Sequence, residues 1–190
     1  KRYYLKSAQP WEIQSLLRAR PVAGDMDLIN AFQQMKRHVI LQRCNEIRGS
    51  DMEHMRRRII REVSREAAGY DIKNGPGGIK EIEFLVQYLQ LKHVPELPDL
   101  IIQNTETAIK QLKKNTILDS DPGDLLSDAY KFLRTVDTLL RLNDENVLKI
   151  NSEIIDIIIR FLNLASKDAL INKIKDTRQK VIEITKKFYG

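Results

Sequence analysis

Apolar residues recur at intervals of three and four along almost the whole chain, and this periodicity constrains the fold more than any other feature. One such stripe consists of Leu28, Ile29, Phe32, Met35, Val39 and Ile40. This spacing places apolar side chains on one face of an α-helix, whereas a half-buried strand needs alternation, and no alternating run of useful length occurs. The sequence therefore predicts an all-α bundle of about seven or eight helices with no sheet.

Proline, glycine and capping residues set the expected helix boundaries. The first expected helix opens at Pro10 and ends at Arg20-Pro21, the second lies between Asp25 and Gly49, and the third lies between Ser50 and Gly69. The others cover about residues 79–93, 100–114, 122–142, 152–164 and 167–188. The residues expected to open or cap them include Pro10, Asp25, Ser50, Asp121 and Ser166, with Glu53 completing a capping box after Ser50. The stretch 154–164 is apolar nearly all round, which predicts a centrally buried helix.

Length and composition fit a single domain over residues 1–190. One cysteine, Cys44, excludes a disulfide framework, and three histidines far apart argue against a metal centre; both features suit a reducing cytoplasm. No apolar run approaches the length of a membrane span. The chain starts at Lys1 with no Met and no apolar stretch behind it, so we expect a fragment of a larger protein rather than a signal peptide.

Positive charge is concentrated in the first part of the chain. Residues 1–75 hold 15 Lys and Arg against 9 Asp and Glu, whereas the remainder holds 17 of each. Eleven of the fifteen arginines also lie in the first part, and the planar arginine fork suits phosphates and carboxylates. An acidic partner or a polyanion is therefore expected there. The basic residues are not interleaved with aromatic ones, which argues against nucleic acid.

The only glycine-rich stretch, Lys73 to Gly78, leads directly into a helix. Free N–H groups at such a junction can bind an anion, but a plain tight turn explains the stretch as well. Glu81 and Glu83 follow it and diverge by about 200° around the helix, so they cannot hold a metal from one face. Glu83 falls on the apolar stripe and should be buried only if it is paired with an arginine or a lysine.

Two groups of arginines are candidates for binding. Arg18 and Arg20 stand beside a turn, where they either clamp a phosphate or form a solvated helix end. A second group forms a basic helix face that is either solvated or docks an acidic partner, and it comprises Arg56, Arg57, Arg58, Arg61 and Arg65. The pairs Asp25/Asp27 and Asp119/Asp121 are spaced like metal ligands, but they lie on no strand and Asp25 and Asp121 fit helix caps better. No catalytic centre and no metal site stand out.

Three segments resemble glutamine synthetase adenylyltransferases. The segment 11–25, WEIQSLLRARPVAGD, is similar to that family's W-E-x-x-x-L-x-(K/R)-A-R-P-V-A-G-D, and the segment 71–87, DIKNGPGGIKEIEFLVQ, resembles its D-I-K-x-G-x-G-G-I sequence and the residues that follow. Residues 129–134 and 139–145 are similar to its A-Y-x-F-L-R segment and the continuation. The resemblance covers about residues 1–150, and the last forty match only as a helical tail.

The resemblance implies a large cytoplasmic bacterial enzyme with two nucleotidyltransferase domains, each followed by a helical bundle similar to that of PII-uridylyltransferases. One half attaches AMP from ATP to a tyrosine of glutamine synthetase, and the other removes it by phosphorolysis, under control of PII signalling protein and glutamine. Paired aspartates for Mg²⁺ belong to a catalytic palm expected before Lys1. The chain itself is then expected to lack catalytic residues, to hold no tightly bound Mg²⁺ or ATP, and to be inactive alone.

The resemblance also suggests which residues border the nucleotide cleft. These are Arg18, Arg20, Asp25, Lys73, Gly77, Gly78 and Glu81, with Glu83 supporting them from below. The segments 18–25 and 73–78 are expected to face one cleft. Asp137 and Arg141 depart from the family pattern. The Trp11-Glu12 and 87–89 segments look somewhat more like the adenylylating half. Two alternatives stay open: a docking module whose arginine face binds glutamine synthetase or PII, and a helical nucleic-acid binder.

Overall fold

The computed structural model describes residues 1–189, which form nine α-helices and three short 3-10 helices without a β-strand. The α-helices are α1 (Arg2–Lys6), α2 (Pro10–Leu16), α3 (Met26–Arg43), α4 (Gly49–Glu62), α5 (Ile79–His93), α6 (Thr105–Lys114), α7 (Ser120–Leu142), α8 (Ile154–Phe161) and α9 (Lys167–Tyr189). The all-α prediction is confirmed. The additional helix is α1, a five-residue turn too short to show an apolar stripe.

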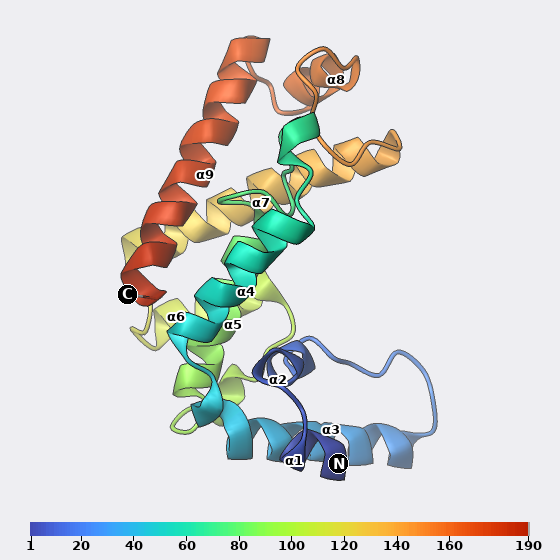
Figure 1. Ribbon diagram of the computed structural model, residues 1–190, viewed down its shortest axis with the longest axis vertical. Helices are drawn as coiled ribbons and strands as arrows, with labels where there is room; N and C mark the ends of the chain where they lie inside the picture. Colours follow the sequence, from blue (N-terminus) through green and yellow to red (C-terminus); the bar gives the residue numbers. More distant parts are fainter. Residues whose placement is uncertain (190) are drawn as a thin grey trace.

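Helix α5 lies at the centre of the fold and packs against α4, α6, α7 and α9. Ten of its fifteen residues are buried, and its observed bounds are the predicted ones. Figure 1 shows α1, α2 and α3 gathered at one end of the molecule and α8 at the other. The buried apolar side chains of both ends belong to one continuous cluster. Side chains on different faces of α5 therefore reach different parts of the molecule.

The helix caps are confirmed at two sites and wrong at two others. Asp25 accepts the N–H of Asp27 at 2.9 Å, and Ser166 accepts that of Ala169 at 3.1 Å. The box of Ser50 and Glu53 does not form, because α4 begins at Gly49 and Asp51 accepts the N–H of Arg48 at 2.9 Å. Asp121 lies inside the first turn of α7 rather than at its cap, since that helix begins at Ser120.

The prediction that residues 154–164 form a centrally buried helix is wrong. Helix α8 packs mainly on α7 and α9, and buries Ile154, Ile155 and Ile158. Ile157 and Phe161 are 41% and 66% exposed. An apolar sequence all round the helix did not lead to central burial because α8 lies at the end of the molecule, with neighbours on one side. No described helix combines the length and apolar character needed to span a membrane.

Candidate functional site

A polar cleft of about 610 Å³ opens between the segment after α2, the start of α6 and the middle of α7. Arg18 and Arg20 line it from the segment after α2, and Tyr130 and Arg134 line it from successive turns of α7. Residues 101–105 and Thr107 complete the lining. The cleft therefore joins two arginines that the sequence indicated with a third, Arg134, from more than one hundred residues further along the chain.

Lys36 fixes the segment that carries the first two arginines. Its side chain is buried, and its amine donates to the carbonyls of Leu17 at 3.1 Å and Ala19 at 2.9 Å. Burial lowers the pKa of Lys36 below its usual value. Lys36 was not among the residues predicted from the sequence. Its position on the apolar stripe of α3, between Phe32 and Ile40, was a signal of its burial.

Glu83 of α5 forms the floor beneath Arg18. Its carboxylate pairs with the Nη1 of Arg18 at 2.7 Å and with the Nζ of Lys80 at 2.9 Å, and it accepts the hydroxyl of Tyr130 at 3.3 Å. Burial alone would raise the pKa of Glu83, but the charges of Lys80 and Arg18 outweigh it, so the pKa lies below its usual value. The prediction that this carboxylate would be buried only as a paired group is confirmed.

The cleft carries an excess of positive charge. Its lining contains three arginines and no acidic residue. Arg18 is compensated by Glu83, whereas Arg20 and Arg134 have no ion pair among residues 1–189. The Nη1 of Arg18 also donates to the hydroxyl of Thr105 at 3.4 Å. Guanidinium groups stay protonated at any physiological pH, so the charge of the cleft is permanent.

The loop of residues 70–78 is closed upon itself. Gly77 donates its N–H to the Oε2 of Glu81 at 2.8 Å, and Gly78 donates to the carbonyl of Gly75 at 3.0 Å. Asp71, buried at the start of the loop, accepts the N–H groups of Arg65, Lys73 and Asn74. The N–H groups that a phosphate would need therefore already have acceptors. Of the two readings left open by the sequence, the geometry favours the tight turn.

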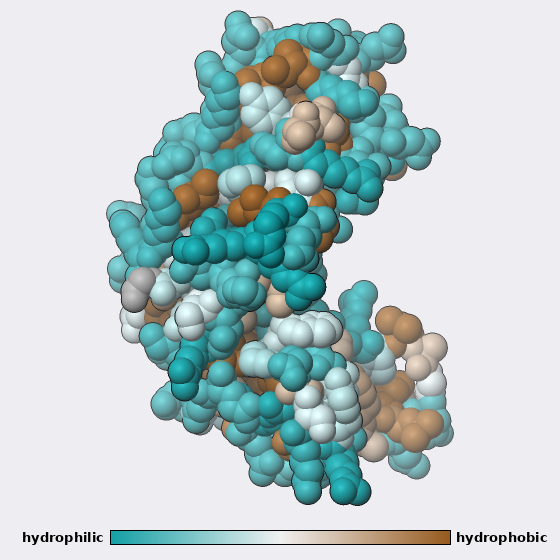
Figure 2. Space-filling model, viewed as in Figure 1, coloured by the Kyte–Doolittle hydropathy of each residue, from teal (hydrophilic) through white to brown (hydrophobic). Residues whose placement is uncertain are grey.

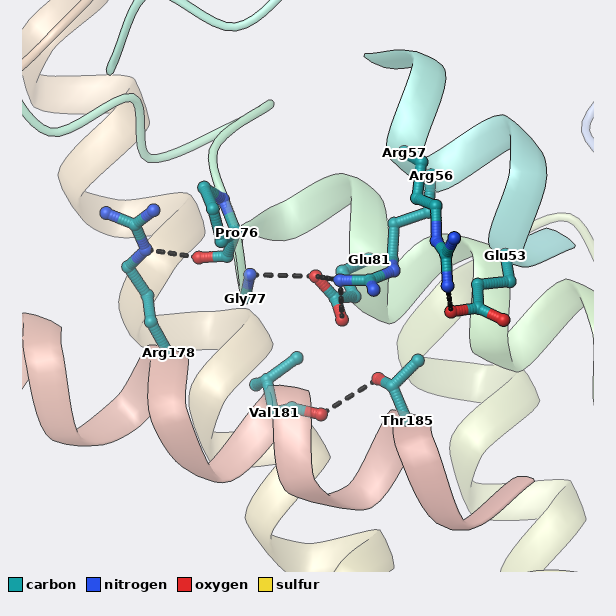
Figure 3. A network of polar contacts seen from close by, with 9 residues as sticks. All are labelled: Glu53, Arg56, Arg57, Pro76, Gly77, Glu81, Arg178, Val181 and Thr185. Carbon is teal, nitrogen blue, oxygen red and sulfur yellow. Dashed lines mark hydrogen bonds and ion pairs between the residues drawn. The ribbon is translucent and has the colours of Figure 1, made fainter. Parts of the chain in front are cut away.

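Helix α9 seals this loop from outside, as Figure 3 shows. The Nε of Arg178 donates to the carbonyl of Pro76, and its Nη1 pairs with Glu66 at 2.7 Å. Gly77 has a φ of +69°, and a Cβ there would stand 2.2 Å from the carbonyl oxygen of Arg178. Only glycine fits a position that combines a left-handed backbone with such a close approach.

Glu81 turns away from the cleft toward α4 (Figure 3), where it accepts from the Nη1 of Arg56 at 3.2 Å. Arg56 is thus largely buried and does not belong to the basic surface predicted from the sequence. On that surface Arg57 pairs with Glu53, and both Arg58 and Arg61 pair with Glu62. The positive charge of α4 is therefore largely balanced by glutamates of the same helix, while Arg65 is exposed beyond its end.

The structure thus divides the residues suggested by the sequence into two groups. Arg18 and Arg20 line the cleft above Glu83. Gly77, Gly78 and Glu81 are buried around the closed loop, Lys73 is half-buried there, and Asp25 caps α3 at the surface. The lining of the cleft includes none of residues 73–78, so the expectation of one shared cleft is not met. Within residues 1–189, no cluster of three His, Cys, Asp or Glu side chains is arranged to hold a metal ion.

Comparison with known proteins places this geometry in a family. Residues 53–189 match the family model described as GlnD PII-uridylyltransferase. The chain belongs to this family. Residues 1–35 match a second model, described as glutamate-ammonia ligase adenylyltransferase. The cleft of this PII-uridylyltransferase family member combines residues of both matched regions. Arg18 and Arg20 lie within residues 1–35, and Tyr130 and Arg134 lie within residues 53–189.

Curated relatives of this family member carry the name bifunctional glutamine synthetase adenylyltransferase/adenylyl-removing enzyme. The proteins from Xanthomonas campestris, Corynebacterium efficiens and Mycobacterium tuberculosis are 37%, 34% and 32% identical over 74% of the chain. The resemblance seen in the sequence is therefore confirmed. The chain spans only 13–15% of the length of these relatives.

Proposed function

We propose that this chain is the helical domain of a bifunctional glutamine synthetase adenylyltransferase/adenylyl-removing enzyme. In that role it supports the transfer of AMP from Mg-ATP to a tyrosine of glutamine synthetase, or the phosphorolytic removal of that AMP. The observation that carries the proposal is the arginine-lined cleft, whose Arg20 is followed in the chain by an exposed apolar segment. The names of the relatives agree with it.

The apolar segment follows the cleft arginines in the chain. Val22, Met26 and Leu28 are 87%, 64% and 72% exposed, and Figure 2 shows apolar surface over this region at the lower right. Contiguous exposed apolar residues mark surfaces that another protein surface covers. We assign this surface to an adjoining nucleotidyltransferase domain, which would then also close over Arg20.

The two domains would divide the reaction between them. No carboxylate cluster of residues 1–189 suits Mg²⁺, so the metal and the catalytic carboxylates would belong to the nucleotidyltransferase domain. The helical domain would contribute cations that neutralise phosphate charge as the nucleotide reacts. The chain alone is then expected to show no transferase activity. We propose the cytoplasm as the location of the whole enzyme.

The alternative of a pure docking module has less support. Four of the five arginines proposed for that surface already carry ion pairs within the chain, namely Arg56, Arg57, Arg58 and Arg61. Docking of glutamine synthetase or PII there would need these pairs to be exchanged. Regulation of the reaction by PII and by glutamine is also part of the proposal, and only the resemblance to glutamine synthetase adenylyltransferases supports it.

Transfer of labelled AMP tests the proposed function. The full-length protein that carries this chain is incubated with glutamine synthetase, Mg²⁺ and α-labelled ATP, and with adenylylated glutamine synthetase and phosphate. We expect modification or its removal by the full-length protein and neither by the 190-residue chain. Replacement of both Val22 and Met26 by serine should lower the activity of the full-length protein, because the domain contact weakens, while the chain stays folded. A full-length protein inactive in both directions on glutamine synthetase would contradict the proposal.

A further inference from the structure

We propose that Arg20, Arg134 and the first turn of α6 form a binding site for a phosphate-bearing anion, with Arg18 held between this site and Glu83. The assignment of the anion as the terminal phosphates of a nucleotide, free pyrophosphate or orthophosphate rests on the proposed function. The site itself rests on the geometry of the cleft. Arg134, which the sequence analysis did not single out, is a member of it.

The charge balance of the cleft calls for an anion. Two guanidinium groups without an acidic partner among residues 1–189 line one polar cavity together with a third. Like charges gathered in a partly enclosed space repel each other more strongly than they would in open water. A bound phosphate removes this repulsion, and the arginine fork matches two phosphate oxygens at once.

The first turn of α6 adds donors to the same cavity. Asn104 caps the helix by accepting the N–H and the hydroxyl of Thr107 at 2.9 and 3.1 Å, and both residues line the cleft. The N–H groups of Thr105 and Glu106 have no acceptor within the helix, as is general for the first turn. Thr105 also lines the cleft, so the positive end of a ten-residue helix and the arginines face the same volume.

Arg18 is held in place before any ligand arrives. Lys36 fixes the carbonyls on either side of Arg18, and Glu83 holds the guanidinium of Arg18 while 42% of that side chain stays exposed. A cation that is already oriented loses less conformational entropy when an anion binds. Lys36 and Glu83 are therefore positioning residues for this site.

The lining favours phosphates over a nucleobase. Tyr130 is its only aromatic side chain, and the hydroxyl of this residue is engaged with Glu83. No second aromatic residue is present to sandwich a base in the cavity. The phosphates of a nucleotide would occupy the cleft, and the base would lie outside it.

Titration of the 190-residue chain with pyrophosphate, ATP, orthophosphate and adenosine, followed by NMR chemical shifts, tests the site and separates the possible sources. We expect pyrophosphate and ATP to bind at the residues of the cleft and adenosine not to compete. The substitutions R20Q and R134Q should each weaken pyrophosphate binding about tenfold, because each removes a charge-assisted contact. R160Q, which removes an exposed arginine of α8, is the matched control and should leave binding unchanged. Circular dichroism confirms that each variant is folded.

Equal binding by R20Q, R134Q and R160Q would overturn the site, as would the absence of pyrophosphate binding or competition by adenosine. The KM for ATP of the full-length protein separates this outcome from failure of the proposed function. If R20Q and R134Q raise neither that KM nor the pyrophosphate Kd while AMP transfer proceeds, the site fails and the function stands. If the variants lose pyrophosphate but the full-length protein does not act on glutamine synthetase, the site stands and the function fails.

Discussion

Glu81 and Glu83 stand two residues apart on α5 and belong to regions of opposite character. Glu81 faces α4 and the closed loop, where it meets Arg56 and the N–H of Gly77. Glu83 lies beneath Arg18, which lines the cleft, and its partners Arg18 and Lys80 are 42% and 34% exposed. In the first region the loop N–H groups have acceptors within the chain. In the second region Arg20 and Arg134 have no acidic partner among residues 1–189. The comparison teaches that the proposed binding site lies where arginine side chains have no acidic partner among residues 1–189.

The closed region is built by segments from three parts of the sequence. Arg56 comes from α4, the loop precedes α5, and Arg178 comes from α9. The Nε of Arg56 and the hydroxyl of Tyr189 are buried there without a partner among residues 1–189. Burial and the nearby charge of Glu81 raise the pKa of Tyr189 far above its usual value, so this hydroxyl stays protonated. The contacts of this region join α4, the loop and α9.

The largest effect is expected for Gly77→Ala. The substitution combines a left-handed backbone with a Cβ placed 2.2 Å from a carbonyl oxygen of α9, and should lower the free energy of unfolding by about 4 kcal/mol. Urea unfolding followed by circular dichroism measures the change. Gly24→Ala is the control, because Gly24 also has a positive φ but no atom within 4 Å of its added Cβ. Similar losses in both variants would show that the loop is not sealed by α9.

A smaller effect separates the two glutamates. Glu81→Ala leaves a buried N–H and a largely buried guanidinium without their acceptor, and should cost about 3 kcal/mol. Glu83→Ala should cost about 2 kcal/mol, because the side chains of Arg18 and Lys80 are 42% and 34% exposed and can be rehydrated by solvent. The same unfolding experiment compares them, with the exposed Glu183→Ala as a reference that should change nothing. A higher cost at Glu83 than at Glu81 would reverse the assignment of closed and open regions.

Acidification sharpens the comparison at Glu83. Because the pKa of Glu83 is lowered in the folded chain, its stabilisation is complete above its unfolded pKa of about 4.3 and is lost as the pH falls through the folded pKa. The difference in stability between the wild-type chain and Glu83→Gln should therefore be constant near neutrality and shrink below about pH 4. Unfolding midpoints measured from pH 7 to pH 3 show this trend. A difference that grows on acidification would contradict the ion pairs described for Glu83.

The smallest effect is expected on the surface of α4. Arg58 is exposed and pairs with Glu62 one turn later in the same helix. Pairs of this kind are screened by water and salt. Arg58→Ala should leave the urea midpoint unchanged within error. Arg56→Ala should lower the midpoint, because the side chain of Arg56 is four-fifths buried on the inner side of the same helix. Equal destabilisation by both substitutions would mean that Arg56 does not serve the closed region.

Local chemistry was sufficient for several elements of the fold. The bounds of α5 followed from apolar spacing, and Asp25 and Ser166 followed from capping preferences that act within three residues. The pairing of Glu83 followed from its place on an apolar stripe. The same type of signal at Lys36 was available and was missed. Such features could be predicted because their causes lie within one or two helical turns.

The sequence by itself thus determined the fold class, most helices and the need of Glu83 for a cation. Only the tertiary structure decided that Arg178 seals a loop one hundred residues earlier. It also decided that Arg134 joins Arg18 and Arg20 in one cleft. The physical reason is that an anion-binding glycine loop and a closed glycine turn have the same local sequence. They differ in whether the loop N–H groups already have acceptors, as they do here, and in whether a distant segment such as α9 covers the loop.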